Sequence, residues 1–291
     1  MTGWFDRFRD FLSRTCGVTL DADKAYFAES RLLSLAQQHG FGSAEDLFSR
    51  YERTRDKVLE RDIVQAMLTN ETFFFRDRIP FDHFRNVILP HLVEARAQQR
   101  QIRIWCAAAS TGQEPYSLAM ILDEEARKLV GWRVEIVATD LSDHALDIAR
   151  AGLYTQFEVQ RGLPVNQLLR YFRREGDRWR VVEHLRARVN FRRFNLLDDY
   201  QALGTFDVVF CRNVLIYFDL GMRRKILGKL AGSIAPDGYL ALGATESVVG
   251  VCDSFEPHPK HQSICSKREA AVSPAAPVPA GRPVLKVIAG G

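Results

Sequence analysis

The chain has 291 residues, 46% of them hydrophobic, so it can bury sizeable cores and its length suggests about two domains. Its formal net charge of +4 is too small to predict a nucleic-acid partner. The five cysteines are widely spaced, with no CxxC pair and no histidine spacing that suits zinc, so no metal is expected. No stretch approaches the ~20 apolar residues of a membrane span, which predicts a cytoplasmic protein without membrane insertion.

The first quarter of the chain is predicted to be an all-helical domain, residues 1–78. Apolar residues recur at helical spacing over 5–12, 24–40 and a long third segment, 43–68. Basic residues of the third segment also follow helical spacing: Arg50, Arg53, Lys57 and Arg61. They could bind an acidic partner, but acidic residues line the adjacent face. A solvated helix with internal ion pairs is therefore the favoured interpretation.

The second domain, residues 79–267, is predicted to have a doubly wound α/β fold, because strands and helices alternate along it. The expected strands are 102–107, 134–140, 189–196, 206–213 and 239–245, and the expected helices are 79–99 (interrupted near Pro90), 114–129, 142–152 and 224–235. An insertion at about 154–187 contains two short strands around Gly176, which predicts a small β-hairpin subdomain. The Ala/Pro-rich segment 268–291 is expected to be a flexible tail or a linker.

The residues that end the predicted strands indicate the ligand site, because open parallel sheets bind ligands outside the carboxyl ends of their strands. The first strand runs into small residues, 107–112, and then into a helix that begins near Glu114. The other three strands end on Asp140, on Asn195 and Leu196, and on Asn213 and Val214. Because carboxyl ends of parallel strands share one edge of a sheet, we expect these residues to lie together.

A cationic nucleoside fits this edge better than a nucleotide does. The small residues allow close backbone approach, but a phosphate beside Glu114 would meet a repulsion of several kcal/mol at an effective dielectric of ~20. Asp140 lies where an acid accepts hydrogen bonds from ribose hydroxyls. Each acid also has a structural alternative, Glu114 as a first-turn acid complementing the helix dipole and Asp140 as a helix N-cap. Taken together, the loop and the acids favour S-adenosylmethionine (SAM) over NAD or ATP.

Five stretches of the sequence resemble the CheR family of chemotaxis receptor glutamate methyltransferases. They are NETFFFR at 70–76, ASTGQEPYS at 109–117, ATDLS at 138–142, NLL at 195–197 and FCRNVLIYF at 210–218, in the family's order. The resemblance runs to about Lys267. It implies a Rossmann-like class I SAM methyltransferase sheet with an all-helical N-terminal domain and a small inserted β-subdomain.

The resemblance also implies a role for each matched residue. The cofactor contacts are expected at Asn70, Thr72, Arg76, Glu114 (methionine amino end), Asp140 (ribose), Asn195, Leu196, Asn213 and Val214. Arg76 and Tyr217 are expected to face the reacting carboxylate. The implied reaction is methyl-ester formation on glutamate side chains of chemoreceptors during adaptation, with SAM as donor, S-adenosylhomocysteine as product and no metal. The implied partners are the cytoplasmic methylation helices of the receptors, and the protein is expected to be a monomer.

Two features depart from the family pattern. Gln113 stands where many members have a glutamate, which removes one negative charge beside the site and leaves Glu114 in place. The hairpin around Gly176 is short and lacks the glycine-rich extension of members that tether to a receptor pentapeptide, so we expect pentapeptide-independent action.

Two other functions stay open at this point. One is a SAM-dependent methyltransferase of the same fold with another substrate, and the other is a SAM-binding regulator without turnover.

Methylation of a carboxylate needs no general base, because a glutamate with a reference pKa of ~4.3 is already ionised near neutral pH. The lack of a recognisable His/Asp or Cys/His constellation agrees with this chemistry.

Overall fold

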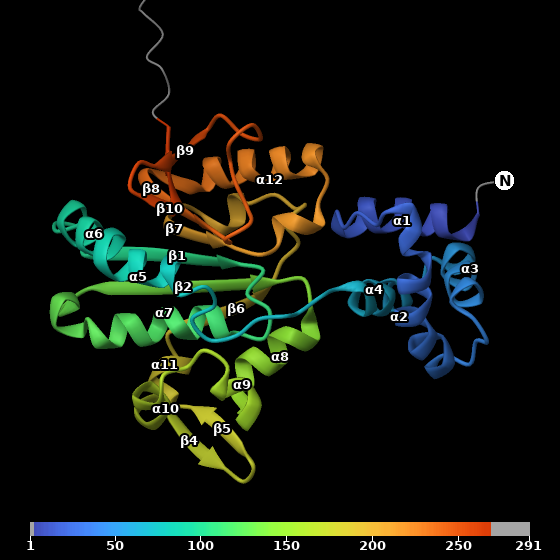
Figure 1. Ribbon diagram of the computed structural model, residues 1–291, viewed down its shortest axis with the longest axis horizontal. Coiled ribbons are helices and arrows are strands. Elements are labelled where there is room, and N and C mark those ends of the chain that lie inside the picture. The colour runs from blue at the N-terminus through green and yellow to red at the C-terminus, as the bar shows by residue number, and fades with distance from the viewer. Residues whose placement is uncertain (1–2, 269–291) are drawn as a thin grey trace, which may run out of the picture.

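The computed structural model describes residues 3–268, so most of the expected tail, 268–291, lies outside the described residues. The N-terminal part contains α1 (Trp4–Cys16), the 3-10 turn η1 (Ala22–Lys24), α2 (Ala25–Gln38), α3 (Ala44–Thr54) and α4 (Lys57–Met67). These helices pack around a core of their own, which includes Phe8, Phe48 and Ile63. Figure 1 shows them beside the end of the sheet to which the arrowheads of β1 and β2 point.

The helix predicted over 43–68 is two helices in the structure. Arg55 adopts a left-handed conformation with φ 52° and ends α3, and the Asp56 carboxylate then accepts hydrogen bonds from the first turn of α4. The left-handed conformation is unfavourable for a residue with a Cβ, so the packing of both helices on the shared core must offset it. The break also divides the four basic residues of this segment, with Arg50 and Arg53 on α3 and Lys57 and Arg61 on α4.

The second domain is built on a seven-stranded sheet in the order β6-β2-β1-β7-β8-β10-β9. The strands are β1 (Gln101–Ala107), β2 (Arg133–Asp140), β6 (Val189–Arg193), β7 (Phe206–Cys211), β8 (Ile234–Leu242), β9 (Phe255–His258) and β10 (His261–Lys267). The first five of these are parallel, as predicted. β9 and β10, which were not predicted, pair antiparallel and extend the sheet beyond β8. The strand order reverses between β1 and β7, which places the ligand edge there.

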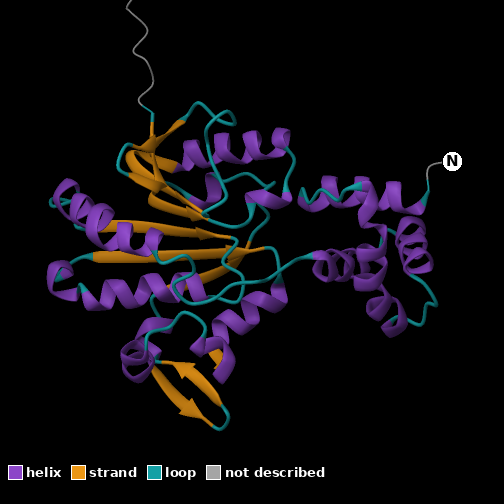
Figure 2. Ribbon diagram, in the orientation of Figure 1, coloured by secondary structure: helices purple, strands orange, loops and turns teal. Residues whose placement is uncertain are grey.

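Helices cover both faces of this sheet, as Figure 2 shows. They are α5 (Ile79–His83), η2 (Phe84–Ile88), α6 (Leu89–Ala95), α7 (Gln113–Glu124), α8 (Asp143–Ala151) and α12 (Leu220–Ser233), with short 3-10 turns at η3 (Ala126–Leu129), η4 (Gln201–Leu203) and η5 (Leu215–Tyr217). Successive strand residues point to opposite faces: Ile104 and Cys106 pack with α5–α7, whereas Trp105 packs with α12. The sheet is therefore buried on both sides.

The helix expected to be interrupted near Pro90 is continuous from α5 to α6. A π-helical turn, η2, precedes Pro90, and the Leu89 amide bonds the Phe84 carbonyl five residues back. Pro90 has no N–H to donate, and the wider π turn accommodates the proline without breaking the helix.

The insertion forms a separate small sheet in the order β3-β5-β4. It contains β3 (Leu153–Thr155), α9 (Gln156–Gln160), α10 (Val165–Tyr171), β4 (Phe172–Glu175), β5 (Arg178–Val181) and α11 (Glu183–Arg186). The hairpin around Gly176 is present as predicted, and β3 adds a third strand on the β5 side. Phe74 packs edge-on against Tyr154 and Phe172, so this residue of the NETFFFR stretch is anchored to the inserted subdomain.

Candidate functional site

A cavity lies at the carboxyl ends of β1, β2 and β7, next to the helical domain. Every residue predicted to contact cofactor or substrate lines it: Asn70, Thr72, Arg76, Glu114, Asp140, Asn195, Leu196, Asn213, Val214 and Tyr217. These residues come from five separate segments of the chain. The fold therefore brings together side chains that the sequence predicted one motif at a time.

The loop between β1 and α7 approaches the cavity with its backbone. Ala108 and Ser110 have positive φ angles of 60° and 53°, and Gly112 has φ 96°. A Cβ on Gly112 would lie 2.9 Å from the Ala149 Cβ, so only glycine lets the loop pack this closely on α8. The resulting turn directs the Ser110 amide at Asp140, with N and Oδ2 2.8 Å apart.

Asp140 is a buried carboxylate with acceptor capacity left over. Its two oxygens accept the amides of Ser110 and Ser142, each at 2.8 Å. A carboxylate offers about four acceptor sites, so further donors such as ribose hydroxyls can be accommodated. Burial raises the pKa of Asp140, and the backbone hydrogen bonds oppose this shift. The N-cap of α8 is the Ser142 side chain, so the alternative capping role is filled by another residue.

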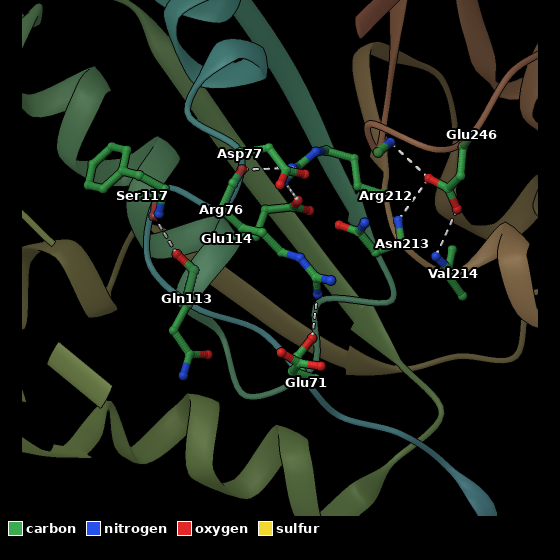
Figure 3. Close-up of polar contacts among 12 residues, drawn as sticks. Glu71, Arg76, Asp77, Gln113, Glu114, Ser117, Arg212, Asn213, Val214 and Glu246 are labelled. Atoms are coloured by element: carbon green, nitrogen blue, oxygen red, sulfur yellow. Dashed lines mark hydrogen bonds and ion pairs between the residues drawn. The ribbon is translucent and has the colours of Figure 1, made fainter. Parts of the chain in front are cut away.

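Glu114 is held by a buried arginine that the sequence analysis did not single out. Arg212 donates from Nη1 to Glu114 Oε2 at 2.8 Å, and from Nη2 to Asp77 Oδ2 at 2.8 Å and to the Arg76 carbonyl at 2.7 Å (Figure 3). Burial raises the pKa of Glu114, although Arg212 opposes the shift. Burial therefore still disfavours the ionised form of Glu114 despite its contact with Arg212. A ligand ammonium group beside the carboxylate would favour that ionised form.

Arg76 sits in a turn with unusual backbone angles. Phe75, Asp77 and Arg78 all have positive φ, at 52°, 67° and 46°. Such conformations persist where surrounding contacts over-determine them, and here Arg212 holds the Arg76 carbonyl and the Asp77 carboxylate. The Arg76 guanidinium donates from Nη1 to the Glu71 carbonyl at 2.7 Å.

Gln113, which departs from the family pattern, is buried and accepts a hydrogen bond from Thr111 Oγ1 at 2.8 Å. Figure 3 shows its side chain pointing away from Glu114. Gln113 does not line the cavity.

The segment after β7 is fixed by a second residue that sequence reasoning missed. Glu246 accepts the amides of Asn213, Val214 and Leu215. Asn213 itself has φ 56°. The stretch around Glu246 reads as a small-residue turn after a strand, a pattern that gives no signal of this role. Arg212 had a weak signal, as a basic residue directly after the apolar strand FDVVFC.

The helical domain closes one side of the cavity. Its contribution consists of Cys16, Val18, Met67, Leu68 and Thr69. Asn195 Nδ2 donates to the Thr15 carbonyl at 2.8 Å, and the Thr19 amide donates to the Tyr217 carbonyl at 2.9 Å. Two residues of the second domain therefore hold the end of the first helix in place, a contact between domains that no local pattern predicts.

The chemistry of the lining residues suits SAM. Glu114 and Asp140 are buried acceptors of the kind that an ammonium group and ribose hydroxyls need. The apolar surface of Leu196, Val214 and the helical domain suits an adenine ring. Among residues 3–268, no group of His, Cys, Asp and Glu is arranged to hold a metal ion, and no helix is long and apolar enough to cross a membrane.

The sequence matches two family models, the CheR methyltransferase all-alpha domain over residues 4–67 and the CheR methyltransferase SAM binding domain over residues 70–264. Chemotaxis protein methyltransferase 1 of Pseudomonas aeruginosa is 46% identical over 256 residues, which cover 87% of this chain and 93% of the relative. Chemotaxis protein methyltransferase Cher2 of Pseudomonas putida is 43% identical over 256 residues, with the same coverage of 87% and 93%. Chemotaxis protein methyltransferase 1 of Vibrio cholerae is 43% identical over 252 residues, covering 86% of this chain and 90% of the relative. Both domains and these relatives agree with the geometry of the cavity, and the chain belongs to the CheR methyltransferase family.

Proposed function

We propose that this protein transfers the methyl group of SAM to glutamate side chains of chemoreceptors and forms γ-glutamyl methyl esters in the adaptation of a chemosensory pathway. The observation that carries the proposal is the convergence of Glu114, Asp140 and Arg76 on one cavity. Two buried carboxylates suit the cationic donor, and an arginine beside them suits an anionic acceptor. The names of the relatives support chemoreceptors as the substrate class.

The residues that would hold SAM follow from their chemistry. Glu114 would bind the ammonium, Asp140 the ribose, and Asn195, Leu196, Asn213 and Val214 the adenosine and the centre of the pocket. Asn70 and Thr72 would complete the methionine end together with Arg76. When bound, SAM supplies an electrophilic methyl group on a sulfonium.

The protein's part in the reaction is orientation. The glutamate substrate is ionised near neutral pH, so no residue has to remove a proton. Arg76 can orient the carboxylate through its planar guanidinium, and the Tyr217 hydroxyl can donate one more hydrogen bond. Correct alignment alone can contribute up to ~7–11 kcal/mol to lowering a barrier. Too tight a grip would weaken the nucleophile, so Arg76 is expected to position the carboxylate more than to bind it.

Incubation with radiolabelled SAM and purified receptor cytoplasmic domains tests the proposal. Methyl esters release volatile methanol in alkali, whereas N-methyl products are stable. We expect label in the receptor that alkali releases as methanol. Alkali-stable label would favour a methyltransferase of the same fold with another chemistry. SAM binding without any transfer would favour a regulator.

The proposal includes the cellular setting. The substrate would be the cytoplasmic methylation helices of the receptors, the protein would act there as a monomer, and a receptor pentapeptide would not be needed. The short hairpin supports the last point, since β4 and β5 are joined by two residues only, Gly176 and Asp177.

A further inference from the structure

We propose that Glu246 is a positioning residue, whose carboxylate sets the shape of the segment 213–217 and so the placement of Asn213, Val214 and Tyr217. The inference rests on the proposed function, because it assigns Glu246 a role through the residues proposed to bind SAM and substrate. Glu246 lies four residues after the end of β8 and outside the motifs that carry the family resemblance.

The Glu246 carboxylate gathers backbone amides from two loops. Oε2 accepts the Asn213 amide at 2.8 Å and the Gly243 amide at 2.8 Å. Oε1 accepts the Val214 amide at 3.0 Å and the Leu215 amide at 2.8 Å. Figure 3 shows the Glu246 carboxylate facing the amides of Asn213 and Val214. The end of β8 is thereby fixed to the segment that follows β7.

Only a carboxylate can make this arrangement. It has about four acceptor sites and no donor, and the four amides occupy them. Because the acceptor is ionised, these hydrogen bonds are stronger than those between neutral groups. A glutamine at this position would place N–H groups against backbone N–H groups. The arrangement also holds Asn213 at φ 56°, a conformation that a residue with a side chain rarely adopts.

Gly243 provides an independent sign that the two loops must approach closely. A Cβ at this position would lie 2.7 Å from Glu246 Oε2, 2.8 Å from Asn213 Nδ2 and 3.0 Å from the Asn213 amide nitrogen. No side chain fits without displacing Glu246, Asn213 or both. Gly243→Ala therefore disturbs the same arrangement while leaving every charge in place.

The displacement would be transmitted directly to the cavity. Asn213 and Val214 line it, and Tyr217 follows in the same turn, with its amide bonded to the Val214 carbonyl at 3.2 Å. If Glu246 only stabilised the fold, replacing it would lower the denaturation midpoint, and the variant that remains folded would have normal activity. A positioning residue changes the activity of the folded protein.

The test compares Glu246→Gln and Gly243→Ala with the wild type, at a temperature where circular dichroism shows each to be folded. Glu256 is an exposed carboxylate on β9, and Glu256→Gln is the matched control for loss of one charge. We expect kcat/KM for receptor methylation to fall on the order of 100-fold in both test variants and to stay unchanged in the control. The SAM dissociation constant, measured by calorimetry, is expected to rise as well.

A double-mutant cycle with Tyr217→Phe separates positioning from simple destabilisation. If Glu246 acts through this segment, the double variant loses less activity than the product of the two single losses. Folded Glu246→Gln and Gly243→Ala proteins with wild-type kcat and SAM affinity, or losses that simply multiply in the cycle, would overturn the proposal. If Glu246→Gln does not fold, Glu246→Asp takes its place in the same measurements, because it keeps the charge but is one methylene shorter. A wild-type protein that binds SAM but methylates no receptor refutes the proposed function, while the SAM affinities still test Glu246.

Discussion

Replacing Arg212 by glutamine removes the cation that two carboxylates of the site share. Arg212 contacts Glu114 and Asp77, both at 2.8 Å, and its side chain is 1% exposed. It also donates to the Arg76 carbonyl in the strained turn. The substitution therefore leaves a buried negative charge without a partner and frees the backbone that carries Arg76.

The expected loss follows from the burial of the partners. Removing one member of a buried ion pair costs about 3–5 kcal/mol, because the remaining charge stays away from water. Glu114, whose side chain is 10% exposed, accounts for most of this loss, since Asp77 is 31% exposed and partly solvated. We expect Arg212→Gln to lower the free energy of unfolding by about 3–5 kcal/mol.

Denaturant unfolding of four proteins measures the effect: the wild type, Arg212→Gln, the double variant with Glu114→Gln, and Glu256→Gln as the control. The double variant should be more stable than Arg212→Gln, because it no longer buries an unpaired charge. The control should lie within about 0.5 kcal/mol of the wild type. The reasoning is refuted if Arg212→Gln loses less than about 1 kcal/mol, or if removing Glu114 destabilises it further.

Four other predictions concern the cofactor and the substrate. Asp140→Ala should weaken SAM binding roughly 10- to 100-fold for each lost hydrogen bond to the carboxylate, and unchanged affinity in calorimetry would contradict its ribose role. Arg76→Ala should lower kcat on the order of 100-fold with SAM saturating, and a near-normal methylation rate would remove it from the catalytic residues. Burial raises the pKa of Glu114 above 4.5 and that of Asp140 above 3.8, and the roles proposed for them in SAM binding require both to be ionised. SAM affinity should therefore fall as the pH is lowered through these raised pKa values, and the fall should begin at a higher pH than for exposed carboxylates. Calorimetry that shows a constant SAM affinity over this pH range would refute the dependence on these two carboxylates. A receptor-type C-terminal pentapeptide should show no binding by titration, and clear saturation would show that the short hairpin suffices for tethering.

Most of the fold was predictable because its signals are local. Alternating strands and helices, the helical periodicity before residue 78 and the glycine-centred hairpin each depend on residues close in sequence. The errors have a common cause in tertiary packing. Arg55 ends a helix that its own sequence would continue, and the π turn before Pro90 keeps a helix that proline would break. β9 and β10 were missed because their short segments form strands only through tertiary pairing, β10 with β8 and β9 with β10.

The residues of the candidate site also fall into those with a local sequence signal and those placed only by tertiary packing. The matched motifs predicted side chains that line the cavity, because each lies at the end of a strand or in a motif that is contiguous in sequence. Glu246 and the surface contributed by the helical domain were not predicted. Their partners lie far away in sequence, and no spacing rule connects them.

The sequence by itself determined which residues are available to bind a cationic nucleoside. The order of residues along the chain specifies where the strands end, where the small-residue loop lies and where the two acids follow. Only the tertiary structure decided how those residues are held. Arg212 reaches partners 98 and 135 residues away, and Glu246 bonds amides 31 to 33 residues earlier. Such contacts depend on the distance between side chains in the folded protein, and burial then makes each charge there dependent on its partner.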